Sequence, residues 1–371
     1  DVYKRQPAGD INPKCREICE QVVYQNRNFQ SNGAGALRLA ASSGGVTGQQ
    51  AELLPEGWRA AALNQGWTYR DITHPDDHGT LISVLMSQRY AHSSKDVWRR
   101  RIASGEIKLN GKLLLKDRPL PDQAELLWCR PPWIEPAIPD TWSVEYDDGD
   151  LLVINKPSGL PVMPGGGFLQ HTLAMLLHQR SRQRGDPLVP KPVHRLGRFT
   201  SGLQVCARKP TTRSALSRCF QPAAGTCKLY QAWAQRVAGL EFGTSLAVNT
   251  DVVERPHPWL GWVWGPLPQS DGLIRRRLQA HSELKLLERC PQGDRLQVAI
   301  STGRPHQIRI HLAQLGSPLL GDPLYLNDQR ISDVATPGDG GYRLHAWSLQ
   351  LNDLHLSCDP PSTFWFSSGS P

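Results

Sequence analysis

The sequence predicts an α+β fold, because strand-like and helix-like stretches follow one another without a regular βαβ repeat. Stretches such as KLYQAWAQRVAG, HSELKLLERC and DRLQVAIST are strand-like. Residues 171–184 and 211–221 each carry an apolar stripe at helical spacing and predict amphipathic helices. The 371 residues provide for two domains, or for one large domain with an appendage.

Composition narrows the class of protein. The chain has no apolar run of 18 residues and its first residues lack an apolar secretory core, so we expect neither a membrane span nor export. A cytoplasmic location is expected, or a plastid if the source is a plant. The eight cysteines form no CxxC pair, which favours reduced thiols over a zinc site. The net charge of +8 favours a polyanionic partner, although many basic proteins bind no nucleic acid.

The first 62 residues differ from the rest of the chain. Residues 34–50 are small, polar and aperiodic, which predicts disorder. Order is expected to begin at LNQGWTYRD, which starts at residue 63. Residues 1–62 are therefore interpreted as a disordered tail or a non-native extension.

Residues 63–129 are predicted to form a small module. Apolar residues at helical spacing from Leu81 predict one helix, and KDVWRRRIASG predicts a second helix that starts after Ser94. Asn110 and Gly111, within EIKLNGKLLL, are a strong signal for a β-hairpin turn. This helix–helix–hairpin order resembles the alpha-L (S4-like) RNA-binding fold.

Most of the net charge lies in residues 89–118, which hold nine Lys or Arg against three Asp or Glu. A solvated basic surface would explain such a run, but its concentration favours contact with phosphates. The residues predicted to make that contact are Arg99, Arg100, Arg101, Lys108 and Lys112.

Residues 130–141 are rich in proline and are predicted to link the module to a second domain. That domain is expected to span residues 142–358, followed by a tail at 359–371. Within it, Trp262 and Trp264 alternate along the chain, which favours strand packing over stacking on bases.

Three stretches of the second domain are more specific than a core requires. NKPSGLPVMPGGG, from Asn155, predicts a rigid loop. HRLGRFTSGLQVCARK, from His194, begins with a polar turn, and TGRPHQIRIHLAQLGSPLLGDPLY, from Thr302, begins with a cluster of basic and amide side chains. They lack the spacing of a phosphate loop, an HExxH zinc site or a GxSxG hydrolase. The histidines could be structural, but two stretches pair them with arginines, which favours a functional site.

In this order, and together with CKLYQAWAQ, the stretches resemble the motifs of the RluA-like RNA pseudouridine synthases. LNQGWTYRD and RYAHSSKDVWRRRI are similar to cyanobacterial and plant members. The resemblance implies a pseudouridine synthase fold with a central, largely antiparallel sheet and an RNA cleft across it. It also implies a monomer that isomerises uridine in structured RNA, rRNA or tRNA, without a cofactor or metal. In this reaction the N-glycosidic bond breaks, the uracil turns, and its C5 joins the ribose C1′.

The resemblance also assigns roles to single residues. Arg195 would help to flip the target nucleotide and fill its place, and Tyr230 would stack on the uracil and take part in proton transfer. Arg309 would pair with a catalytic carboxylate and keep it ionised. The further RNA contacts that the resemblance implies are His194, Lys156, Arg304, His306 and Gln307.

Gly197 stands where the family motif HRLD has its catalytic Asp. Glycine has no side chain and can be neither nucleophile nor base, so three interpretations remain open. Another carboxylate reaches the site, with Asp322 or a member of residues 145–150 as candidates. The protein binds RNA without modifying it, or the carboxylate is supplied otherwise. A carboxylate within about 4 Å of the Arg309 guanidinium that also faces Tyr230 would favour catalysis.

Overall fold

A computed structural model of the chain describes residues 61–90, 92–220, 228–258, 260–268, 272–351 and 353–365. The disorder predicted for residues 1–62 falls outside these ranges, except at its last two positions. Cys15, Cys19 and Cys227 also fall outside. The other five cysteines are free thiols, as the sequence predicts: Cys129, Cys206, Cys219, Cys290 and Cys358.

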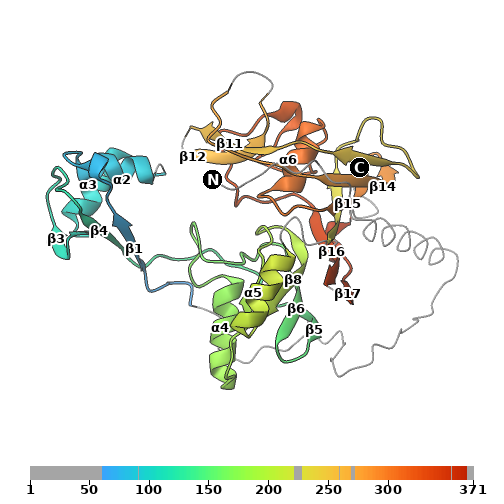
Figure 1. Cartoon of the computed structure of the whole chain (residues 1–371), viewed down its shortest axis with the longest axis horizontal. Helices are drawn as coiled ribbons and strands as arrows, with labels where there is room; N and C mark the ends of the chain where they lie inside the picture. Colours follow the sequence, from blue (N-terminus) through green and yellow to red (C-terminus); the bar gives the residue numbers. More distant parts are fainter. Residues whose placement is uncertain are drawn as a thin grey trace.

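Residues 63–130 form a small body with its own hydrophobic core, which Figure 1 shows at one end of the molecule. Its four antiparallel strands lie in the order β1-β4-β2-β3, with two helices packed beside them. The elements are β1 (Trp67–Ile72), α2 (Ile82–Arg89), α3 (Lys95–Ala103), β2 (Ile107–Leu109), β3 (Lys112–Leu114) and β4 (Glu125–Arg130), with a 3₁₀ turn at Pro75–Asp77.

The local signals in this body act as predicted. The Ser94 hydroxyl caps α3 by accepting a hydrogen bond from the Val97 N–H. Asn110 and Gly111 have φ values of 49° and 78°, as a two-residue type I′ hairpin turn requires. The predicted order of two helices followed by a hairpin is therefore confirmed.

The rest of the chain is built on one ten-stranded sheet, ordered β10-β14-β15-β9-β16-β8-β6-β5, with β17 paired to β16 and β7 to β8. Every pairing is antiparallel except that of β16 with β8, so the predicted largely antiparallel sheet is confirmed. The strands are β5 (Ser143–Asp147), β6 (Leu151–Lys156), β7 (Lys191–Pro192), β8 (Ser201–Ala207), β9 (Lys228–Ala234), β10 (Ser245–Val248), β14 (Ser282–Cys290), β15 (Gly293–Ile300), β16 (Leu344–Leu351) and β17 (Leu354–Ser357).

Three helices and a smaller sheet accompany this sheet. The helices are α4 (Leu173–Arg184), α5 (Pro210–Cys219) and α6 (Gln307–Gln314), with 3₁₀ turns at Asn327–Gln329 and Ser362–Phe364. The smaller sheet, ordered β12-β11-β13, consists of β11 (Val252–His257), β12 (Gly261–Pro266) and β13 (Arg276–Leu278). Trp262 and Trp264 lie on β12, so the strand predicted there is present.

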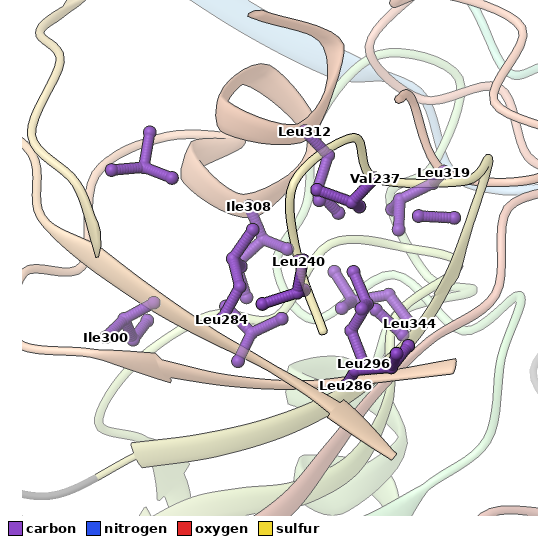
Figure 2. Packing of buried hydrophobic residues seen from close by; sticks show 14 of the residues in the cluster. Val237, Leu240, Leu284, Leu286, Leu296, Ile300, Ile308, Leu312, Leu319 and Leu344 are labelled. Carbon is purple, nitrogen blue, oxygen red and sulfur yellow. The ribbon is translucent and has the colours of Figure 1, made fainter. Parts of the chain in front are cut away.

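Apolar packing fixes α6 on the large sheet. Figure 2 shows Ile308 of the helix directed toward Leu284 of β14, and Leu312 of the helix beside Val237. These side chains are buried, and together with Leu296 and Leu344 they belong to one core cluster. The helix that carries Arg309 therefore rests on a rigid support.

The parallel pairing brings two distant segments together. Gly202 of β8 lies beside Ala346 of β16, and a Cβ at Gly202 would come within 2.3 Å of the Ala346 carbonyl oxygen. Gly202 has a φ of 105°, so only glycine suits both the conformation and the close approach. This contact places the turn before β8 next to the residues before β16.

The proline-rich segment 130–141 is anchored along its length. The Glu135 carboxylate, on a residue only 2 % exposed, accepts hydrogen bonds from the Asn64 side chain and from the backbone N–H groups of residues 169–171. The Trp133 indole N–H donates to the Gly167 carbonyl oxygen. This segment is thus a docked strap rather than a free tether.

Candidate functional site

The second and third predicted stretches meet around one cavity of about 220 Å³. Tyr230 reaches it from β9, and Tyr342 from the segment just before β16. The residues that line it are His194, Arg195, Leu196, Gly197, Thr200, Phe220, Lys228, Tyr230, Ile300, Gly303, Arg304, His306, Gln307, Ile308, Arg309, Tyr342 and Leu344. Of the residues predicted from the resemblance, only Lys156 is not part of this wall.

The wall is strongly cationic. Its lysine and arginine side chains are Arg195, Lys228, Arg304 and Arg309, and no Asp or Glu is among the described residues that line it. Arg195 is exposed and makes no hydrogen bond or ion pair with a described residue. The cavity therefore suits a ligand that carries or develops negative charge.

Arg309 has a carboxylate partner. Its Nε and Nη2 donate to the two Asp322 oxygens over 2.7 and 2.8 Å, and neither side chain is more than 2 % exposed. Burial opposes the charge, yet the hydrogen bonds to Asp322 raise the pKa of Arg309 further above its usual range. Of the carboxylates considered from the sequence, Asp322 is thus the one that pairs with Arg309.

Asp322 is fully engaged and is not part of the cavity wall. Besides Arg309, it accepts hydrogen bonds from the N–H groups of Leu324 and Tyr325. In the predicted acidic run 145–150, Asp147 pairs with Arg208. The described residues therefore offer no carboxylate that both contacts Arg309 and faces Tyr230.

Lys156 lies behind the site. Its side chain is 0 % exposed, and the Nζ donates to the carbonyl oxygens of Pro157, Leu160 and Arg198 over 2.9 to 3.0 Å. Burial, together with the nearby charge of Arg198, lowers the pKa of Lys156 to about 7. The predicted RNA contact does not fit this position, where the ammonium instead ties the first stretch to the Gly197–Arg198 turn.

Two other predicted contacts are occupied by internal bonds. Gln307 donates to the His281 carbonyl and the Ser282 hydroxyl, and its amide oxygen accepts from the Thr302 hydroxyl. His194 Nε2 accepts from the Val205 N–H, which fixes its neutral form, and burial lowers its pKa to about 3. Both side chains shape the wall of the cavity rather than offering a free group to a ligand.

His306 begins α6 in a left-handed conformation, with a φ of 53°. Its Nδ1 lies 2.6 Å from the Tyr325 hydroxyl, which donates its own proton to the Trp264 carbonyl. His306 therefore carries the proton on Nδ1. Burial, followed by the charges of Arg309 and Arg195, lowers its pKa to about 3, so the ring is neutral.

Two tyrosines complete the wall. Burial raises the pKa of Tyr230 to about 12, which keeps its hydroxyl protonated near neutral pH. The second tyrosine, Tyr342, was not anticipated from sequence, because it belongs to none of the three stretches. A Cβ at Gly197 would lie 3.0 Å from the Tyr342 hydroxyl oxygen and 3.2 Å from the Thr200 hydroxyl oxygen. The Tyr342 phenol thus lies directly beside the position that a side chain at residue 197 would take.

Comparisons with known proteins decide the family. Residues 150–314 match the family model described as RNA pseudouridylate synthase. The chain is 40 % identical over 277 residues to an uncharacterised RNA pseudouridine synthase of Synechocystis, covering 73 % of this chain and 88 % of the relative. The chain belongs to the RNA pseudouridine synthase family.

Two further relatives of this synthase have informative names. RNA pseudouridine synthase 5 of Arabidopsis thaliana is 33 % identical over 347 residues, covering 79 % of this chain and 90 % of the relative. Ribosomal large subunit pseudouridine synthase D of Xylella fastidiosa is 31 % identical over 264 residues, covering 69 % and 74 %. The predicted similarity to cyanobacterial and plant members is confirmed.

The predicted phosphate contacts of the synthase lie in the other body. Arg101 is not a free contact, because its guanidinium carbon lies 4.4 and 4.6 Å from the ring centroids of Trp98 and Trp128. Arg99 forms ion pairs with Asp96 and Asp117. The side chains left available to a ligand are exposed Arg100 and Lys112 and half-buried Lys108.

The described residues show neither a metal site nor a membrane-spanning helix. They contain no cluster of three His, Cys, Asp or Glu side chains that could hold a metal ion. None of their helices is long and apolar enough to cross a membrane.

Proposed function

We propose that this member of the family converts uridine to pseudouridine in a structured RNA, rRNA or tRNA. The observation that supports this function is the cavity. Its described lining residues include four cations and Tyr230, and none of them is an Asp or Glu. Uracil detached from ribose carries negative charge, and fixed cations around it stabilise that state. The name of the Xylella relative favours ribosomal RNA among the possible substrates.

The target base has to leave its stack to enter such a cavity. Exposed and unpaired, Arg195 is free to occupy the place of the flipped nucleotide. The ring of Tyr230 offers a stacking surface, and its protonated hydroxyl can donate a hydrogen bond. Arg304 and neutral His306 supply further polar contacts in the cavity wall, just before the first residue of α6.

The basic module, residues 63–129, is proposed as an alpha-L (S4-like) RNA-binding unit ahead of a catalytic domain at 142–358. Its two helices, its hairpin and its excess of positive charge support this proposal. Phosphate contacts of this kind carry affinity without sequence specificity. We further propose that the protein acts as a monomer and needs no cofactor. Its proposed location is the cytoplasm, or a plastid if it comes from a plant.

A second candidate is an RNA-binding protein without catalytic activity. It is favoured by the lack of a carboxylate among the described residues that line the cavity, and by the engagement of Asp322 in the pair with Arg309. Loss of a catalytic group commonly costs about 10³-fold or more in rate, so the two candidates differ clearly in an assay.

The test is tritium release from total cellular RNA labelled with [5-³H]uridine, prepared from cells that lack the gene. Pseudouridine formation replaces the C5 hydrogen, so an active synthase releases tritium to water. Mapping of pseudouridines in RNA with and without the gene then identifies the position. RNA binding without tritium release, and identical maps, would favour the second candidate.

A further inference from the structure

Resting on the proposed function, we propose that the Tyr342 hydroxyl oxygen is the catalytic nucleophile at the ribose C1′ in this chain, in the place that Gly197 leaves empty. The proposal deepens the proposed function by naming the group that acts on the sugar. It stands on three observations about Tyr342: its position, its lack of a partner, and its contact with Arg309.

The position is defined by Gly197. The Tyr342 oxygen lies 3.0 Å from the point that a Cβ at residue 197 would occupy, and both residues line the cavity. A side chain at residue 197 and the phenol of Tyr342 would therefore compete for the same space. A Cβ at residue 197 would require the phenol oxygen to shift by a few tenths of an ångström.

The hydroxyl is unengaged although the residue is buried. Tyr342 is 5 % exposed, and its oxygen makes no hydrogen bond with any described residue. It is also absent from the fully buried polar atoms without a partner, so the oxygen is open to the cavity. The oxygen is therefore accessible to a ligand in the cavity and is not held by another described residue.

Arg309 faces the same ring. Its guanidinium carbon lies 4.2 Å from the Tyr342 ring centroid, while Asp322 holds the guanidinium from another side. The guanidinium therefore packs against one face of the ring and holds it at the cavity wall. The other lining hydroxyls are those of Thr200 and Tyr230, and the raised pKa of Tyr230 keeps it in the protonated form.

The reaction balances as two displacements at one carbon. The Tyr342 proton passes to solvent, and the phenol oxygen forms a bond to C1′ while the C1′–N1 bond breaks and its electron pair leaves on uracil. The uracil turns, its C5 bonds to C1′, and the bond to the Tyr342 oxygen breaks. The C5 proton is lost to solvent, and N1 and the phenolate each regain a proton. Tyrosine is an established nucleophile in glycoside chemistry.

The experiment compares Tyr342→Phe with the wild type in the tritium-release assay on [5-³H]uridine-labelled total RNA. Phenylalanine keeps the ring against Arg309 and removes only the unpaired oxygen. We expect tritium release to fall by about 100-fold or more, while the melting temperature and the retention of the same unlabelled RNA on a filter stay unchanged. Tyr325→Phe is the matched structural control, because the Tyr325 hydroxyl donates to the Trp264 carbonyl and its loss should lower the melting temperature.

A second pair of variants tests the shared space. In Gly197→Asp alone, the new side chain meets the Tyr342 oxygen, so we expect reduced stability and no gain of tritium release. In the double variant Gly197→Asp with Tyr342→Phe, the oxygen is gone and a carboxylate can enter. We expect at least about a tenfold recovery over Tyr342→Phe.

The outcomes separate this inference from the proposed function. Tritium release by Tyr342→Phe within threefold of the wild type would overturn the role of Tyr342 and leave the synthase function standing. A loss accompanied by a lower melting temperature and weaker RNA retention would also overturn it, as a structural effect. A loss that the double variant does not recover would overturn the pairing of the two positions. A wild type that binds the RNA and releases no tritium would overturn both proposals.

Discussion

The basic module and the cavity are both rich in arginine, yet they hold the charge differently. In the module, Arg89 pairs with Asp71 and Asp77, and Arg99 with Asp96 and Asp117. In the cavity the described lining residues include cations and no carboxylate, and the partner of Arg309 is not among them. Arginines in the module thus hold a small fold together, whereas those in the cavity wall suit a ligand that carries negative charge.

The sharpest way to break this comparison is Arg309→Met. The change leaves the Asp322 carboxylate buried without its cation, and removing one partner of a buried pair costs about 3–5 kcal/mol of the free energy of unfolding. Urea unfolding measures this cost. Arg195→Met is the matched control, because Arg195 is exposed and unpaired, and it should leave the midpoint unchanged. A loss below about 1 kcal/mol in Arg309→Met would contradict the structural role of the pair.

The next effect is expected from Glu135→Gln. Burial raises the pKa of Glu135, but the N–H groups of residues 169–171 and Asn64 outweigh it and lower the pKa below its usual range. The carboxylate therefore stabilises the fold above the ordinary pKa, and this contribution is lost as the pH falls through the folded-state value. We expect a loss of about 2–4 kcal/mol at pH 7.

Acid titration of the unfolding free energy separates this effect from a general loss of stability. Below pH 4 the difference between wild type and Glu135→Gln should shrink. Glu283→Gln serves as the control, because the Glu283 side chain makes no hydrogen bond with a described residue. A difference in the free energy of unfolding between Glu135→Gln and wild type that stays constant from pH 7 to 3 would argue against a stabilising role of the ionised Glu135 carboxylate.

Lys156→Met tests the interior behind the cavity through the pH dependence of stability. The folded-state pKa of Lys156 is about 7, below the ordinary 10.5, so the unfolded chain binds more protons between these values. The free energy of unfolding should therefore rise with pH from 7 upward, by at most about 1.4 kcal/mol per unit, and this gain is lost as the pH falls through 7. Urea unfolding at pH 6, 7, 8 and 9 should show the rise in wild type and not in Lys156→Met. Equal slopes in the two proteins would remove Lys156 as the cause.

The smallest effects separate two neighbouring arginines of the module. Arg101→Ala removes a cation held between two tryptophans and should lower the free energy of unfolding by about 1–2 kcal/mol. Arg100→Ala should leave stability unchanged and reduce the slope of log affinity against log salt by about one phosphate contact. Unfolding curves and filter binding at several salt concentrations measure the two. If both variants lose only RNA affinity, the arginines of the module serve ligand binding rather than the stability of the fold, as those of the cavity wall do.

What could be predicted from sequence was what short-range signals determine. The hairpin at Asn110–Gly111, the cap at Ser94 and the amphipathic helix from Leu173 follow from neighbours within a few residues. Two of the three stretches also met at one cavity, since motifs that carry chemistry lie near one another in space.

The remainder depends on long-range contacts that no local pattern encodes. The sequence alone predicts that Lys156 is an RNA contact. In the fold, its ammonium donates a hydrogen bond to the carbonyl oxygen of Arg198, which lies 42 residues away in the sequence. Tyr342 comes to Gly197 only because β8 and β16 pair in parallel. Charge and motif identify such residues as candidates, and only the fold distinguishes a buried tie from an accessible group.

The hydrogen bonds that the Glu135 carboxylate accepts determine how the protein can be divided into fragments. The carboxylate belongs to the proline-rich segment, its amide donor Asn64 lies at the start of the module, and its backbone donors at 169–171 lie before α4. A fragment that begins at residue 142 would carry the three N–H groups without their acceptor, and a fragment that ends at 129 would leave Asn64 without its own. A shortened chain that keeps these bonds should therefore begin no later than residue 63. The proline-rich segment 130–141 resembles a spacer in the sequence, but both domains need it for these hydrogen bonds.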